Sequence, residues 1–269
     1  FGGITLSSLA EPTWGFPMNR TCLSVLRAVL ALLAFAGATR GHAAADTIFT
    51  DSLENQFFVP ASDAEAARFL TQASFGPSRL EISRLKSMGY DNWLADQFNQ
   101  PVTLARPWMD TLTTNGVVIG QGQRMDRWFY TAALGPDQLR QRMAFALSQI
   151  LVISDRNDAL SGDVTGVAEY WDILARGAFG NYRDLLEPVT LSPQMGKFLS
   201  HLRNRKAVPA QNLYPDENYA REVMQLFTVG LEQRNNDFSL ILDGSSQPIP
   251  TYDQTVVTNM ARVLTGFSY

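Results

Sequence analysis

Residues 138–153 read QLRQRMAFALSQILVI and predict the central helix of the fold. Apolar residues recur at helical spacing along one face, at Leu139, Met143, Ala146, Ile150 and Ile153. More apolar residues spread around the other sides, at Phe145, Leu147, Leu151 and Val152. A helix that is apolar on nearly all sides is normally buried inside its domain. We therefore expect other helices to surround this one.

Three short helices are predicted upstream, between residues 62 and 100. Two of them begin with a capping box, Ser62 with Glu65 and Ser78 with Glu81, in which side chains satisfy the free backbone N–H groups of the first turn. Their ends are marked by glycine or proline, at Gly76, Gly89 and Pro101. Such closely spaced start and stop signals indicate a tight helical subdomain.

Further helices are predicted at 124–134, 164–175, 182–189, 194–202, 216–229 and 253–264. Residues 102–123 and 204–215 predict loops, and 238–252 a short hairpin or extended loop. The fold class is therefore mainly α: a multi-helix globular domain of short capped helices over residues 62–269, with at most one minor β-hairpin. Because the chain stops at Tyr269 after an apolar helical segment, we expect this domain to be incomplete at its C-terminus.

Residues 18–45 have the layout of a secretory signal peptide. Arg20 and Arg27 precede an apolar stretch over residues 28–38, and small residues follow up to Ala45. A membrane span is the alternative, but this stretch is about half of the roughly 20 residues that a bilayer requires. We expect cleavage after Ala45, export to the periplasm or medium, and no stable membrane anchor afterwards. Residues 1–17 would be a non-structural upstream segment, and 46–61 an extended leader.

The chain is acidic, with 22 Lys and Arg, 26 Asp and Glu and a formal net charge of −4. Cleavage after Ala45 removes three arginines and one glutamate, which leaves the remainder more acidic. A chain without a Lys/Arg run argues against nucleic acid and anionic membranes as partners, because phosphate binding needs concentrated positive charge. An extracytoplasmic protein or polymer of unknown identity is the partner we expect.

Cysteine and histidine are rare: the chain has one Cys, Cys22, and two His, His42 and His201. After cleavage only His201 remains, so a Cys nucleophile, a disulfide and a Cys/His zinc site are excluded, and no metal or cofactor is expected. A Ser-His-Asp site would depend on His201, but no Gly-x-Ser-x-Gly elbow accompanies it. We interpret His201 as a structural residue near a helix end.

Two loop motifs have ordinary structural interpretations. Residues 155–163 have the oxygen density of a calcium loop, but Ala159 and Leu160 occupy the places of a ligand and of the turn glycine. We expect a loop between helices in which Asp163 caps the next helix. Gly120-x-Gly122 lacks the strand-turn-helix setting of a phosphate loop.

Carboxylates are the remaining candidates for acid/base chemistry. On the predicted helix 216–229, Glu222 lies at the edge of the buried face, with Asn218 one turn before it. A partly desolvated carboxyl group suits a general acid, so Glu222 is the candidate catalytic residue, and Asn218 and Arg221 would position substrate. The structural alternative pairs Glu217, facing away from the core, with Arg221, and Glu222 with a neighbouring cation such as Arg142.

A second carboxylate pair, Glu169 and Asp172, is spaced i,i+3 on a predicted helix beside Trp171. Such a pair could serve a sugar stacked on an aromatic ring. Adjacent aromatic residues on a helix point about 100° apart, so we expect Trp171 to belong to the core instead.

Four strings carry a resemblance to a known family: AARFLTQASFGP at 66–77, GYDNWLADQF at 89–98, NYAREVMQLFTVGL at 218–231 and ARVLTGF at 261–267. Together they resemble the bacterial family called domain of unknown function 1800. The resemblance implies a mostly helical, exported protein that is often longer than this chain, and it implies no activity. It also leads us to expect His in many relatives where this chain has Phe227, which weakens a metal or base role for this helix.

Two functional hypotheses follow. The first is a non-catalytic exported module that binds or organises another extracytoplasmic protein or polymer. The second is a carboxylate-dependent hydrolase with Glu222 as general acid. A hydrolase predicts a pocket at Glu222 with a second carboxylate about 5 to 10 Å away. A binding module predicts an exposed apolar surface.

Overall fold

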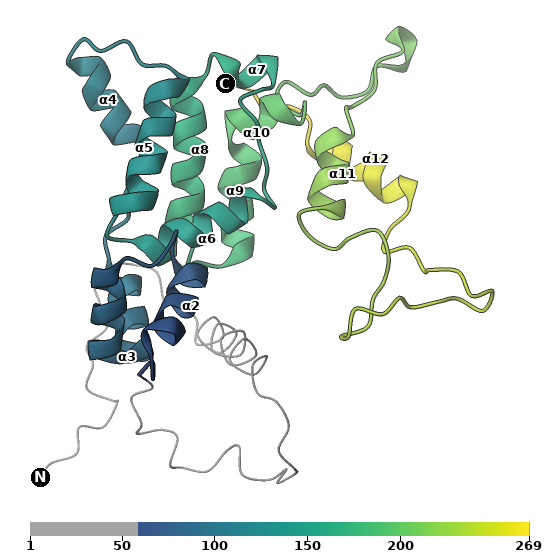
Figure 1. Cartoon of the computed structure of the whole chain (residues 1–269). Coiled ribbons are helices and arrows are strands. Elements are labelled where there is room, and N and C mark those ends of the chain that lie inside the picture. Colours follow the sequence, from purple (N-terminus) through teal and green to yellow (C-terminus); the bar gives the residue numbers. More distant parts are fainter. Residues whose placement is uncertain (1–58, 269) are drawn as a thin grey trace, which may run out of the picture. The chain divides into compact units, whose positions relative to one another are not determined.

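Helix α6, Gln138–Ser148, packs against α8, Val164–Gly177, in the computed structural model of the chain (Figure 1). The structure describes residues 59–268. The predicted upstream segment 1–17, signal peptide 18–45 and nearly all of the leader 46–61 lie outside the described residues. The described part is mainly α, as the sequence predicts.

The N-terminal pair α2, Asp63–Ala73, and α3, Arg79–Asn99, packs against α6. Both predicted caps form, because the Ser62 and Ser78 hydroxyls accept hydrogen bonds from the backbone N–H groups of Glu65 and Glu81. The two helices predicted on either side of Gly89 are parts of α3, which breaks at that glycine (φ 81°). A left-handed φ at the break favours glycine because it has no Cβ.

The predicted loop 102–123 is wrong in part, because it contains α4, Arg106–Thr114, and the start of α5, Gln121–Leu134. Pro107 lies in the first turn of α4, where proline is tolerated, so it starts this helix and does not mark a loop. The Asp172 carboxylate in α8 accepts hydrogen bonds from the N–H groups of Ala105 (2.8 Å) and Arg106 (2.9 Å). The cap of α4 thus comes from a residue far away in the sequence.

The central helix is shorter than predicted. It ends at Ser148, and turns follow through Leu151, which is fully buried. Ile150 and Val152 are exposed, so not every side of this segment faces the core. Helix α8 packs against α4, α5, α6, α7 (Asp158–Ser161), α9 (Tyr182–Leu191) and α10 (Pro193–Phe198), and so is the more enclosed of the two.

The C-terminal part consists of α11, Asn218–Gln225, and α12, Gln254–Val263, which lie side by side (Figure 1). Before α11, the loop 204–216 contains the short helix η3, Pro209–Gln211. Between the helices, residues 231–251 form three extended arms joined by isolated antiparallel bridges, Glu232 with Pro250, Arg234 with Leu240, and Leu242 with Pro248. The hairpin predicted from residue 238 begins earlier, near Glu232, and α11 ends at Gln225 instead of 229.

Candidate functional site

Helix α11 carries the three predicted site residues. Glu222 is half-buried, and its Oε2 is shielded from solvent without a hydrogen-bond partner among the described atoms. Asn218 and Arg221 are exposed on the same helix. The boundary position predicted for Glu222 is therefore present, whereas its catalytic role stays a prediction.

Arg221 is held by a network that joins α11 to α12. Its guanidinium donates to the Glu217 carboxylate (2.6 Å) and to Oε1 of Gln254 (2.8 Å). Glu217 also accepts from Nε2 of Gln254 (2.9 Å) and from the Thr258 hydroxyl (2.9 Å). Glu217 thus pairs with Arg221 as the structural alternative predicts, and α12 supplies further donors that the sequence pattern could not show. These hydrogen bonds, first of all that from Gln254, lower the pKa of Glu217.

Arg142 is not the partner of Glu222. Its guanidinium lies over the rings of Phe75 (5.9 Å) and Phe145 (5.3 Å). Helix α6 packs against α2, α3, α5 and α8, and the Arg142 guanidinium on it therefore interacts with aromatic rings on that side of the fold. The sequence pattern marked Arg142 as a cation on an apolar helix and could not show which neighbour it meets.

His201 is buried, 2% exposed, and packs in the core. Its Nε2–H donates to the carbonyl of Thr190 (2.8 Å) near the C-terminal end of α9, and its ring stacks on Tyr219 at 4.1 Å. Burial lowers the pKa of His201. This geometry agrees with the structural interpretation of the residue, although the carbonyl belongs to a preceding helix.

The remaining predicted carboxylates have structural partners. Asp172 caps α4 and is 2% exposed, and burial raises its pKa. Glu169 pairs with Arg176 at 2.9 Å. Asp163 caps α8 through the N–H of Gly166, as predicted, and also binds Lys197 (2.8 Å).

Within residues 59–268, no group of three His, Cys, Asp or Glu is arranged to hold a metal ion.

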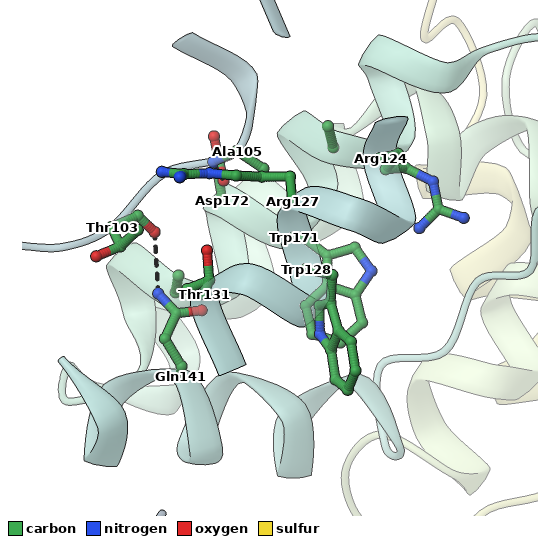
Figure 2. Close-up of a pocket in the computed structure, with 11 residues that line it drawn as sticks. Thr103, Ala105, Arg124, Arg127, Trp128, Thr131, Gln141, Trp171 and Asp172 are labelled. Atoms are coloured by element: carbon green, nitrogen blue, oxygen red, sulfur yellow. Dashed lines mark hydrogen bonds between the residues drawn. The ribbon is translucent and has the colours of Figure 1, made fainter. Parts of the chain in front are cut away.

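A small pocket lies between α5, α6 and α8, and the candidate residues from the sequence, apart from Asp172 and Trp171, do not line it (Figure 2). Figure 2 shows Arg127 extending across it beside Asp172, with Trp128 and Trp171 next to each other on another side. The Nε of Arg127 is buried without a partner among the described atoms. The cavity measures about 30 Å³, which is room for a water molecule or two.

A larger hollow, about 400 Å³, lies where the loop 204–216 meets the end of α12. Its lining includes Asn204, Arg205 and Lys206 from the loop and Thr265 and Gly266 from the chain after α12. Two adjacent cations are too short a run to mark this site in the sequence. The pairing of that loop with residues 265–266 could not be foreseen from local patterns.

The fold is that of a mainly α-helical protein built of short capped helices. The chain belongs to the family described as "Protein of unknown function (DUF1800)", whose family model matches residues 68–269. No curated protein and no solved structure matches the chain. Among the described helices, none has the length and apolarity needed to cross a bilayer.

Proposed function

We propose that this chain is an exported binding module that contacts an extracytoplasmic protein through its C-terminal apolar surface. We use this name for the exposed apolar residues that follow α11 and those on α12, namely Leu226, Val229, Leu231, Phe238, Leu240, Leu242, Val256 and Val263. An accumulation of large apolar side chains in solvent is typical of protein interaction sites. An exposed apolar surface is the feature that distinguishes a binding module from a hydrolase.

The observation that carries this proposal is the turn that presents Phe238. This side chain is 78% exposed, and its backbone is left-handed, with φ 66°. A bulky residue in this region is a strained outlier, and such strain concentrates at functional positions.

Several hydrogen bonds hold the turn in place. Arg234 donates to the carbonyl of Phe238 (2.9 Å), and the Asn235 amide donates to the Ser239 hydroxyl (3.0 Å). The carboxylate of Asp237 accepts from the N–H (3.0 Å) and the hydroxyl (2.6 Å) of Ser239. An aromatic ring carried on an ordered turn loses little backbone entropy on docking, which suits the anchor of an interface.

Site-specific photo-crosslinking in the producing bacterium tests this proposal. A photoreactive phenylalanine analogue replaces Phe238 in one variant and Tyr130, an aromatic residue of α5 that is 59% exposed, in the control. We expect a discrete crosslinked protein in the extracytoplasmic fraction from position 238 and not from position 130. A second substitution, Leu242→Ser, should weaken that crosslink. Equal labelling from both positions, or none from 238, contradicts the proposal.

The export step has its own measurement. Mass spectrometry of the protein recovered from the periplasm or medium should give an N-terminus at Asp46, the residue after Ala45. Recovery of the chain only from the cytoplasm with residues 18–45 intact would contradict export. Any protein crosslinked at position 238 would then be a cytoplasmic partner.

One observation supports a hydrolase as the second candidate, with Glu222 as general acid and Asn218 and Arg221 as positioning residues. The buried, unpartnered Oε2 of Glu222 is the kind of polar atom that a substrate could satisfy. Release of nitrophenol from a panel of nitrophenyl glycosides and esters tests this candidate. A substrate should be found for which Glu222→Gln lowers kcat by about 100-fold or more. Equal rates for the wild-type chain and this variant on every substrate contradict it.

A further inference from the structure

We propose that the 400 Å³ hollow around Arg205 and Lys206 binds a small organic anion that carries a carboxylate or phosphate group. The hollow is more open to solvent than the cavity of Figure 2, and its volume is comparable to the roughly 300 to 1,000 Å³ of small-molecule sites. The cavity of Figure 2 is about 30 Å³ and admits only water, so the two hollows differ in what they can hold. This inference does not depend on the C-terminal apolar surface.

The charge of the hollow is the first argument. Arg205 and Lys206 line it side by side, in a chain whose net charge is −4. Within residues 59–268, no Asp or Glu lies within 4.0 Å of the charged nitrogens of either residue. A guanidinium binds carboxylate or phosphate oxygens in pairs, and an ammonium adds a point charge. Two cations without carboxylate partners in a concave site favour an anionic ligand.

The second argument is that the loop is already ordered. Asn204, 7% exposed, closes its base by donating to the carbonyl of Asp216 (3.0 Å) and accepting from the Asp216 N–H (2.8 Å). Val208 and Leu213 exchange two backbone hydrogen bonds, of 2.9 and 3.2 Å, across the loop. A compact loop whose ends meet is frequently functional, and a site formed before binding loses less entropy.

The third argument is the attachment of the loop to the end of α12. The N–H of Gly266 donates to the carbonyl of Asn204 (2.9 Å), which fixes the cationic segment against residues 265–266. Gly266 has φ +89°, and a Cβ there would meet nothing within 4 Å. Glycine is therefore favoured by the backbone conformation and not by crowding.

The neutral lining indicates an organic ligand. Val208 and Leu213 contribute apolar side chains, while Gln211 and Thr265 contribute an amide and a hydroxyl. A few polar groups among apolar ones are typical of sites that orient small molecules. Two compact organic anions serve as probes of the site: citrate, which carries carboxylate groups, and glycerol phosphate, which carries a phosphate group.

Calorimetric titration of the full chain with citrate and with glycerol phosphate tests the proposal. We expect at least one probe to bind, and the double variant Arg205→Gln/Lys206→Gln to weaken its binding at least tenfold. The matched control Arg156→Gln removes an exposed cation elsewhere and should change the affinity less than twofold. Binding of citrate alone identifies a carboxylate site, and binding of glycerol phosphate alone identifies a phosphate site.

Amide NMR shifts locate the bound probe. The largest changes are expected at Thr265 and Gly266, and the thermal unfolding of the double variant should match that of the wild-type chain because both cations are exposed. The proposal is overturned if neither probe binds, if the control loses as much affinity as the double variant, or if the shifts cluster away from the hollow. Phe238 plays no part in this experiment, so its result is independent of the proposed function.

Discussion

Glu217 and Gln254 join the last two helices of the described chain, because the Gln254 amide donates to both carboxylate oxygens of Glu217, at 3.1 and 2.9 Å. The same Gln254 accepts from Arg221 at 2.8 Å. Helices α11 and α12 also pack together, and both contribute to the core cluster, through Tyr219, Ala220 and Ala261. The polar network thus lies beside an apolar contact and fixes how the two helices sit.

Replacement of Gln254 by Ala should lower the free energy of unfolding by about 1 to 2 kcal/mol. The variant loses its hydrogen bonds to a carboxylate and to a guanidinium, and bonds to charged groups are stronger than neutral ones. Urea denaturation measures the difference. Gln247→Ala is the matched control, because this exposed amide lies in the hairpin segment, and it should change stability by less than about 0.5 kcal/mol. Equal losses in the two variants would show that the network adds nothing.

The lowered pKa of Glu217 predicts an acid-sensitive contribution to stability. Hydrogen bonds from Gln254 and Thr258, together with Arg221, favour the ionised Glu217 carboxylate in the folded chain. They therefore lower its pKa below the ordinary value of 4.5 that it has in the unfolded chain. A lowered folded pKa stabilises the protein above 4.5, and this contribution is lost as the pH falls through the folded pKa. Urea denaturation from pH 6 to pH 2.5 should therefore show a smaller loss for Glu217→Gln than for the wild-type chain. Parallel curves for the two proteins contradict the prediction.

His201 should titrate below its ordinary value of 6.5, because burial disfavours the charged imidazolium. NMR of the imidazole protons measures this directly. The unfolded chain binds a proton below pH 6.5 before the folded chain does, so the free energy of unfolding falls as the pH drops from 6.5 to the folded pKa. Tyr219→Phe keeps the stacked ring and should leave the titration low. A midpoint at or above 6.5 would contradict the buried, neutral state.

Asp172→Ala should release α4 from α8 and lower the free energy of unfolding by about 2 to 3 kcal/mol. The N–H groups of Ala105 and Arg106 lose a charged acceptor, and such bonds contribute about 1.5 to 3 kcal/mol. Limited proteolysis should then cut within residues 100–120. Glu169→Ala on the same helix removes an exposed ion pair and should cost less than about 1 kcal/mol. Resistance of the Asp172 variant to protease would contradict this role.

The helices with local signals could be predicted from the sequence. The serine caps at Ser62 and Ser78 form as expected, and so does the break at Gly89, because each depends on residues within one turn. The return bonds of the two capping boxes do not form, because the glutamates bind other groups. Helix α4 could not be found in this way, since its cap, Asp172, lies in another helix. Long-range placement decides such elements, and local propensity does not encode it.

The candidate site was predictable only in part, for the same reason. The periodicity placed Glu222 at the edge of a buried face, and the structure has it there. It could not show that α12 supplies donors to Glu217, or that Arg142 meets Phe75 and Phe145. Likewise, the hollow at Arg205 depends on contact with Gly266, which is distant in the sequence.

The unpartnered Oε2 of Glu222 leads to a test that separates a scaffold role from a functional one. A buried acceptor without a donor costs about 1 to 3 kcal/mol, so Glu222→Met, which removes it, should raise the free energy of unfolding by about 1 kcal/mol or more. Glu187→Met, on an exposed face of α9, is the control and should change stability by less than about 0.5 kcal/mol. A stabilised Glu222→Met variant would mean that the native residue is kept at the expense of stability, as residues at functional sites often are. Destabilisation would instead mean that a partner satisfies Oε2 in solution, and Glu222 would then belong to the scaffold.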